Sequence, residues 1–472
     1  MKPVAAFVRL PDGRDLHLRY AGSGPALVLL HPSPLSSALM TPWIQAFARD
    51  FSVYAFDTPG YGASDPLRQP ARSLQDYLPT LEAACDQLKL QRVFVFGQAT
   101  GAQLGIAWAK RHPARIAQLF LDAACHFEPA QRAAIMRGYF PSLSMRADGA
   151  HLTRIWHIVE RLFQFFPWFD TRTENRIHRP EPPLAAKHAI ALEYARAGGG
   201  YAEAYRLAFE HEDASQLSGL QAATHVIGWR HSLVHPYTEQ LLAHTLPDVV
   251  KPMLIECSPS ERYQALATLL RQAAATTAVT EGHAGAPRHA ERRYLSLQGM
   301  QIYTRRWTRE GTLYSHKLGE SSALLAHSGS VFDWPGHGLS GPLEPHLDPA
   351  ALLGSLPAQV ASELSLPNLS GPEQGPKQGP KQGPKQGPQQ WAKDWPEHCQ
   401  LRPCATGAHF MAAWRLAERH CLNHPPQPSD QLGARNRVLS TRRTQARALA
   451  LLEASASLSL WLCADQGPQA RA

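Results

Sequence analysis

The sequence predicts an α/β protein with a mostly parallel sheet and a helical cap, followed by a degenerate partial repeat of the same pattern. Apolar runs of strand length alternate with helical segments up to Asp122, which is typical of a parallel sheet with helical crossovers. A long helical and aromatic segment then interrupts the alternation and predicts the cap. Short motifs recur in the same order after residue 290, and this recurrence predicts the repeat.

The hairpin, strands and first helix of the alternating region each have their own signal. Asp12-Gly13 lies inside an alternating stretch and predicts a β-hairpin over residues 7–20. Continuous apolar runs predict strands that are buried on both faces of a sheet, and amphipathic spacing predicts a helix between two of them. These elements are strands at 25–30, 51–56 and 92–96, and a helix at 74–88.

Composition divides the chain into domains and connecting segments. Residues 126–216 are helical and rich in aromatic side chains, as expected of a cap over a pocket. The Ala-, Thr- and Gly-rich stretch at 273–290 predicts a linker between a domain at 1–272 and the partial repeat at 291–472. Within the repeat, Gln-Gly-Pro-Lys recurs at about 371–390 and predicts an extended, solvated spacer.

The overall composition is that of a large globular protein. Its 472 residues correspond to two or three domains, and 44% of them are hydrophobic, which is enough to bury a core. The formal net charge is +8, but the basic residues run singly along the chain rather than in a stripe. Because nucleic-acid binding requires clustered positive charge, we expect no nucleic-acid partner.

The cysteines and the amino terminus bear on the compartment. Seven widely spaced cysteines include no C-x-x-C pair, so we expect reduced thiols, no metal site and no cofactor. The amino terminus has no apolar signal segment, and no run approaches the ~18 apolar residues of a membrane helix. We therefore expect a cytoplasmic protein with no membrane partner.

Three motifs point to a family. Gly97-Gln98-Ala99-Thr100-Gly101 lies between a strand and a helix, where small residues permit a sharp turn. His31-Pro-Ser-Pro34 follows the first buried strand, and Asp57-Thr-Pro-Gly-Tyr-Gly-Ala-Ser64 follows the second. The motif at 97–101 resembles the nucleophile elbow of the α/β-hydrolase fold family. The motif at 31–34 resembles the oxyanion loop of that family, and the motif at 57–64 resembles its D-x-P-G-x-G-x-S loop. The resemblance implies that fold for residues 7–272.

The resemblance also implies a nucleophile at the position of Ala99, and a methyl group cannot attack a carbonyl. Thr100 follows it, and in such an elbow this residue contributes its backbone N–H to the oxyanion hole rather than a reacting side chain. Together with Ser33, Thr100 would still form a polar anchor for a carbonyl or carboxylate. We expect His31 to orient this oxyanion loop.

The acid and the base of a catalytic triad are also missing from the segments where the family has them. The turn at 228–236 has no carboxylate, and the segment at 253–262 has no histidine. His231 and His235 are the nearest titratable groups, so they are the candidate bases. We therefore expect a degenerate triad.

The second half repeats the first in shortened form. Only five residues separate His327 from Asp333, whereas 25 separate His31 from Asp57. Ala405 occupies the nucleophile position of this copy. The recurring motifs lie at 294–307, 323–329, 331–340, 403–408 and 458–466.

Three functions remain open from the sequence. The first is a pseudoenzyme of the α/β-hydrolase family that binds a small, partly apolar carbonyl or carboxylate compound under the cap. The second is an active hydrolase or lyase that cleaves an ester or a C–C bond without a serine nucleophile. The third is a non-catalytic scaffold or subunit, for which a homo-oligomer would complete the shortened sheet.

Overall fold

The computed structural model divides the chain into two compact units. The first unit comprises residues 1–144 and 157–289, and the second comprises residues 145–156 and 290–472. The structure describes residues 1–282, 291–306, 313–315, 330–335, 337–342, 344, 346–347, 349–364, 406, 409–414, 417 and 444–453.

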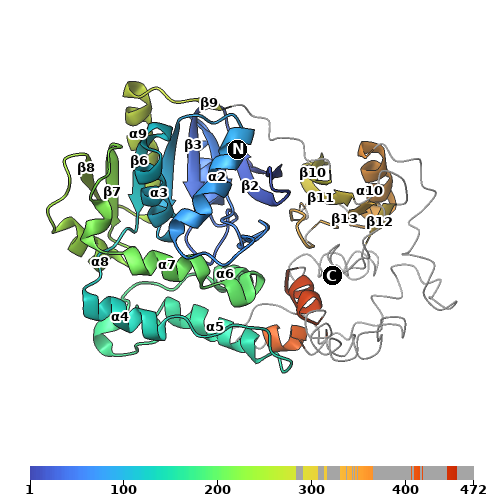
Figure 1. The fold of residues 1–472 in the computed structure, drawn as a ribbon. Coiled ribbons are helices and arrows are strands. Elements are labelled where there is room, and N and C mark those ends of the chain that lie inside the picture. Colours follow the sequence, from blue (N-terminus) through green and yellow to red (C-terminus); the bar gives the residue numbers. More distant parts are fainter. Residues whose placement is uncertain are drawn as a thin grey trace. The chain divides into compact units, whose positions relative to one another are not determined.

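One mostly parallel sheet organises the first unit, as the sequence predicted (Figure 1). Its strand order is β1-β2-β4-β3-β5-β6-β7-β8, and β9 pairs with β3. The pairs β1–β2, β2–β4 and β3–β9 are antiparallel, and the other neighbouring strands are parallel. The strands are β1 (Val4–Arg9), β2 (Asp15–Ala21), β3 (Gly24–Leu30), β4 (Ser52–Phe56), β5 (Val93–Gln98), β6 (Ile116–Asp122), β7 (Thr224–Trp229), β8 (Val250–Ile255) and β9 (Glu281–Gly282).

Helices cover both faces of this sheet, which explains why its central strands are apolar throughout. Alternate residues of each strand enter two separate clusters: Val28 and Val95 lie in one, and Leu27 and Phe94 lie in the other. Helices α2 (Leu78–Gln87) and α3 (Thr100–Arg111) supply the first cluster. Helices α1 (Thr41–Phe47) and α9 (Pro259–Thr276) supply the second.

The chain between β6 and β7 is helical, as expected of a cap. Its helices are α4 (Pro129–Gly138), α5 (Ala150–Leu162), α6 (Leu184–Ala197) and α7 (Glu203–His211). Figure 1 shows α4, α6 and α7 lying together below the sheet. Helix α8 (His235–Leu242) follows β7 and returns the chain to the sheet. No helix in the described part of the chain is long and apolar enough to cross a membrane.

The stretch that we expected to be a linker begins inside the first unit. Residues 273–276 are the last turn of α9, and β9 pairs with Gly24 and Pro25 at the start of β3. The backbone N–H of Thr280 also donates to the carbonyl of Arg92 at 2.9 Å. The chain therefore stays bound to the sheet as far as Gly282, and residues 283–290 lie outside the described residues.

The described strands of the second unit form a smaller sheet with the order β10-β11-β13-β12. Its antiparallel and parallel pairings match those of β1-β2-β4-β3 one for one. Leu352, Leu356 and Val360 of the following helix pack with Ile302 and Phe332 of the sheet. The elements are β10 (Arg292–Leu297), β11 (Met300–Arg306), β12 (Leu313–Ser315), β13 (Ser330–Phe332) and α10 (Pro349–Glu363).

The loop after β13 repeats the hydrogen bonds of the loop after β4. In the first unit, Ser64 Oγ donates to the carbonyl of Asp57 at 2.8 Å, and the residue before Ser64 donates its N–H to Asp57 Oδ2 at 2.9 Å. In the second unit, Ser340 Oγ donates to the carbonyl of Asp333 at 2.6 Å, and the preceding N–H donates to Asp333 Oδ2 at 2.9 Å. The two loops are therefore held by the same pair of Asp and Ser hydrogen bonds.

Several other predicted features of the second half lie outside the described residues. They are the motifs at 323–329 and 458–466, the spacer at 371–390, Trp307, and the elbow-like motif at 403–408 with the exception of Thr406. Ala405 is among them.

Candidate functional site

The turn between β5 and α3 is as sharp as the G-x-A-x-G motif predicts. Ala99 has φ 49° and ψ −113°, a conformation that residues with a side chain rarely adopt. A Cβ on Gly101 would lie 2.1 Å from the carbonyl oxygen of Leu30, and a Cβ on Gly97 would lie 2.3 Å from the carbonyl oxygen of Gly101. The turn therefore needs both glycines, and it presents a methyl group at its apex.

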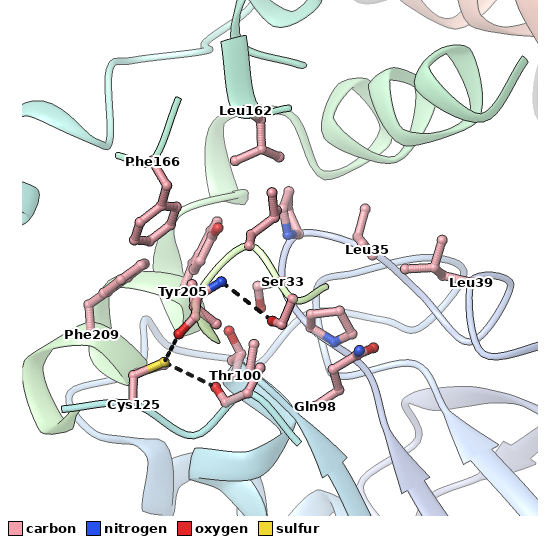
Figure 2. Close-up of a pocket in the computed structure, with 18 of the residues that line it drawn as sticks. Ser33, Leu35, Leu39, Gln98, Thr100, Cys125, Leu162, Phe166, Tyr205 and Phe209 are labelled. Carbon is pink, nitrogen blue, oxygen red and sulfur yellow. Dashed lines mark hydrogen bonds between the residues drawn. The ribbon is translucent and has the colours of Figure 1, made fainter. Parts of the chain in front are cut away.

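The apex of this turn faces a cavity of about 300 Å³ in the first unit. Gln98, Ala99, Thr100 and Cys125 form the floor at the ends of β5 and β6. In Figure 2, Leu162 and Phe166 lie above this floor, Tyr205 and Phe209 lie on one side, and Leu35 and Leu39 lie on the other. The lining is mostly apolar, so the few polar groups that reach the cavity determine what it can bind.

Two of these polar groups are hydroxyls of Ser33 and Thr100, residues that the sequence analysis selected for an anchor made by their backbone N–H groups. Ser33 and Thr100 are buried, both line the cavity, and within residues 1–282 neither hydroxyl has a hydrogen-bond partner. Thr100 is also the first residue of α3, so its backbone N–H has no partner inside the helix. The structure thus brings two buried hydroxyls without a partner to the lining of the cavity.

His31 is buried beside the cavity and joins two loops. Its Nε2 accepts the N–H of Thr58 at 2.9 Å, and its Nδ1 lies 3.0 Å from the carbonyl oxygen of Pro32. Burial lowers the pKa of the ring, which favours the neutral form that accepts one bond and donates the other. This geometry fits a residue that orients the oxyanion loop.

The two candidate bases lie at the margin of the site. His231 is exposed, and its ring centroid lies 5.4 Å from that of Trp229. His235 begins α8, and its Nε2 lies 3.4 Å from a carboxylate oxygen of Glu239. Neither residue lines the cavity, although Ser232 between them does.

An ion pair that sequence reasoning missed lies next to the elbow. Asp122 at the end of β6 is fully buried, accepts a hydrogen bond from Gln98 Nε2 at 2.8 Å, and pairs with Arg262. The guanidinium carbon of Arg262 lies 4.1 Å from the ring centroid of Trp229 and 4.9 Å from that of Trp43. Arg262 lines the cavity and is only 7% exposed. Cation–π contacts and an ion pair therefore hold this guanidinium in place.

Arg262 belongs to the segment at 253–262, in which we expected a triad histidine and found none. A guanidinium stays charged at every physiological pH, so it cannot act as a general base. One sequence signal for Asp122 was available: it is a carboxylate at the end of a buried strand, next to the strand that carries the elbow. The position of Arg262 had no comparable signal.

Two further ionisable groups line the cavity. Glu212, just after α7, is 5% exposed, and burial raises the pKa of its carboxyl well above the ordinary value. Burial likewise raises the pKa of the Cys125 thiol well above its ordinary value. Burial therefore disfavours the charged form of both groups. Among the described residues, no cluster of three or more His, Cys, Asp or Glu side chains could hold a metal ion.

Comparison with known proteins shows which protein family residues 25–150 match. A family model described as the alpha/beta hydrolase fold matches residues 25–150, which include the elbow, Ser33 and Asp122. This part of the chain belongs to the α/β-hydrolase fold family. We call the first unit, which contains most of this match, the hydrolase-fold unit. Glu212 and Arg262 belong to it but lie outside the matched residues.

The curated relatives carry different activities in their names. A pimeloyl-[acyl-carrier protein] methyl ester esterase from Nitrosomonas europaea is 30% identical over 115 residues, which are 23% of this chain and 41% of that protein. A haloalkane dehalogenase from Agrobacterium fabrum is 30% identical over 167 residues, which are 33% of this chain and 51% of that protein. The chain thus spans about half of these relatives or less, and the matches indicate a family rather than a substrate.

Solved structures match part of this chain over most of their own length. Epoxide hydrolase A from Mycobacterium thermoresistibile has a TM-score of 0.46 and 17% identity, with 59% of this chain and 100% of that chain covered. The enol-lactonase from Burkholderia xenovorans has a TM-score of 0.42 and 20% identity, with coverage of 57% and 99%.

Proposed function

We propose that the hydrolase-fold unit binds a small, partly apolar carbonyl or carboxylate compound under the cap, and that it does not hydrolyse this compound through a serine triad. One combination of residues carries the proposal. Ala99 occupies the apex where the family has its nucleophile, and beside it Asp122 is paired with Arg262 rather than with a histidine. The site therefore has neither a nucleophile nor a base at the elbow.

The chemistry of the lining indicates the kind of ligand. The hydroxyls of Ser33 and Thr100, and the Nε of Arg262, are buried without a hydrogen-bond partner in the described part of the chain. Unpaired buried donors are costly, and a carbonyl or carboxylate oxygen would satisfy them. The apolar remainder of the cavity would surround the carbon skeleton of the ligand.

The alternative of a histidine-based enzyme has weaker support. His231 and His235 would have to reach the cavity from outside its lining, and His235 already faces Glu239. A base must lie within about 3 Å of the proton that it removes, or act through one water molecule. We therefore place non-covalent binding first.

Binding can be tested by titrating hexanoate into the protein and measuring the heat. We expect Ser33→Ala and Thr100→Val each to weaken binding roughly three- to tenfold, because each removes one hydrogen bond to the ligand. Ser52→Ala is the matched control, since Ser52 Oγ is also buried and unpaired within residues 1–282 but does not line the cavity. Equal weakening by all three variants would contradict the proposal.

Loss of the triad can be tested by rebuilding it. We expect the unmodified protein to hydrolyse p-nitrophenyl butyrate no faster than the uncatalysed reaction, and Ala99→Ser to change little because no base accompanies it. Ala99→Ser with Arg262→His places a serine and a histidine beside Asp122, and should hydrolyse the ester at least roughly a hundredfold faster than either single variant. The proposal fails if the unmodified protein is an esterase and Thr100→Val abolishes this activity.

We also propose that the second unit is a partial copy of the first. Two observations support this: the identical pairing order of the two four-strand sets, and the matching hydrogen bonds of Asp57 and Asp333. The copy would act as a structural appendage or subunit interface rather than as a second catalytic site.

A further inference from the structure

The cap side of the cavity contains an acid with no counter-charge. Glu212 lines the cavity and is 5% exposed. Within residues 1–282, no hydrogen-bond donor and no Lys, Arg or His side chain pairs with its carboxyl, and burial is the sole cause of its raised pKa. The backbone around it is fixed, because the N–H of Phe127 donates to the carbonyl of Glu212 at 3.0 Å.

Aromatic rings line the cavity on the same side. The ring centroids of Tyr139 and Tyr205 lie 5.3 Å and 5.4 Å from that of Phe209, and the centroid of Phe166 lies 6.1 Å from that of Tyr139. In Figure 2, Phe166, Tyr205 and Phe209 face the cavity from the cap side, away from Leu35 and Leu39. The two tyrosine hydroxyls bond each other at 3.0 Å, so they are already satisfied.

The other ionisable groups near Glu212 cannot neutralise it. Burial raises the pKa values of Cys125, Tyr139 and Tyr205, so these groups are uncharged near pH 7. The neighbouring Asp213 is paired with Arg132 at 2.6 Å. An unpaired buried carboxylate is costly, so burial favours the protonated form of Glu212 as long as no cation pairs with it.

We propose that Glu212 binds the ammonium group of the ligand on the side of the cavity that Tyr139, Tyr205 and Phe209 also line. A cavity lined by a carboxyl group and aromatic rings is favourable for an organic cation, because cation–π attraction can add to the ion pair. This inference rests on the proposed function, in which the other end of the ligand is bound by Ser33, Thr100 and Arg262. The ligand class is therefore an amino-substituted carbonyl or carboxylate compound.

Binding of an ammonium group would have a measurable proton balance. Because burial favours the protonated form of Glu212, formation of the ion pair should displace protons to solvent, whereas the alkylammonium group keeps its own proton at pH 7. Binding of an amine ligand should therefore release protons. A ligand without the amine leaves the protonation of Glu212 unchanged and should release none.

We expect calorimetry with three matched probes at pH 7 to separate these cases. The probes are 6-aminohexanoate, 6-hydroxyhexanoate and hexanoate, each titrated in buffers that differ in ionisation enthalpy. We expect 6-aminohexanoate to bind roughly ten- to a hundredfold more tightly than 6-hydroxyhexanoate, and to release protons as it binds. The two probes without an amine should release no proton.

The variant Glu212→Gln keeps the shape of the side chain and removes its charge. We expect it to lose both the preference for 6-aminohexanoate and the proton release, while its binding of hexanoate stays within roughly twofold. If the unmodified protein binds hexanoate but shows no preference for the amine and no proton release, the inference about Glu212 is wrong and the proposed function stands. If none of the three probes binds, the proposed function is wrong as well.

Discussion

At the scale of single residues, the stability of the site depends on Arg262. Asp122 is fully buried, and Arg262 is its cationic partner. Removal of one member of a buried pair leaves the other charged and desolvated, which costs about 3–5 kcal/mol. We expect Arg262→Met to lower the free energy of unfolding by about that amount, measured by urea denaturation.

A double variant separates the charge effect from lost packing. Asp122→Asn combined with Arg262→Met has no unpaired carboxylate, so it should recover most of the stability that Arg262→Met loses. Arg262 also packs between Trp43 and Trp229, and the methionine retains part of that contact. If both variants are equally unstable, packing rather than charge holds this region together.

This pair also shows why the site could be predicted only in part. Ser33, Thr100 and His31 could be placed because each belongs to a local motif with its own turn chemistry. Asp122 and Arg262 are 140 residues apart, and their contact depends on how β6 and α9 pack. Glu212 was missed for the same reason: an acid at the end of a helix is normally exposed, but tertiary packing leaves this one only 5% exposed.

At the scale of elements, the turn between β5 and α3 keeps a strained backbone although it carries no nucleophile. Ala99 has φ 49° although its methyl side chain is unreactive. A residue held in such a conformation costs about 1–3 kcal/mol. The strain persists because the strand before the turn and the helix after it fix both of its ends.

Ala99→Gly should therefore stabilise the protein. Relief of the strained φ outweighs the larger backbone entropy that glycine has in the unfolded chain, so we expect a gain of about 1 kcal/mol in the free energy of unfolding. Hexanoate binding should stay within roughly twofold, because the methyl group is not one of the proposed donors. Gly101→Ala is the contrasting change, and it should destabilise by about 2 kcal/mol or more because its Cβ would collide with Leu30. Stabilisation by both changes would contradict this account.

Most of the elements could be predicted from the sequence, and the exceptions have a physical cause. The buried strands were found because apolar runs between turn residues are local signals. Strand β9 was missed, because a two-residue strand in an Ala- and Thr-rich stretch is specified by its distant partner Gly24 and not by its own composition. Its pairing keeps the chain on the first sheet as far as Gly282, ten residues beyond the boundary at 272 that composition indicated.

At the scale of the whole molecule, the matching strand order of the two sheets supports the proposal that the second unit is a partial copy of the first. The recurring motifs were visible in the sequence, but the shared strand order was not, because pairing is set by contacts between distant segments. In the first unit, Asp57 holds together the loop that recurs in the second unit. It accepts bonds from the N–H groups of Ser37 at 2.7 Å and Ala63 at 2.9 Å, and its Oδ2 lies 2.8 Å from His17 Nδ1.

These contacts give a pH-dependent prediction for the first unit. Burial alone would raise the pKa of Asp57, but His17 and Arg19 reverse the effect, so that the pKa lies far below its ordinary value. The folded state then holds its charge where the unfolded state takes up a proton, near pH 3.9. Stability from Asp57 is therefore complete above about pH 5 and falls as the pH drops further.

Asp57→Asn tests this prediction and Asp333→Asn extends it to the second unit. We expect Asp57→Asn to lower the free energy of unfolding at pH 7 by about 2–4 kcal/mol, with a smaller difference from the unmodified protein at pH 3. Hydrogen exchange should show lost protection in β2 and β4, which flank this loop. If the second unit is a copy of the first, Asp333→Asn should cause the same loss in β11 and β13, because Asp333 accepts the equivalent backbone bond. Unchanged exchange in β11 and β13 would mean that the shared hydrogen bonds do not stabilise the second sheet, and that the resemblance between the loops has no energetic counterpart.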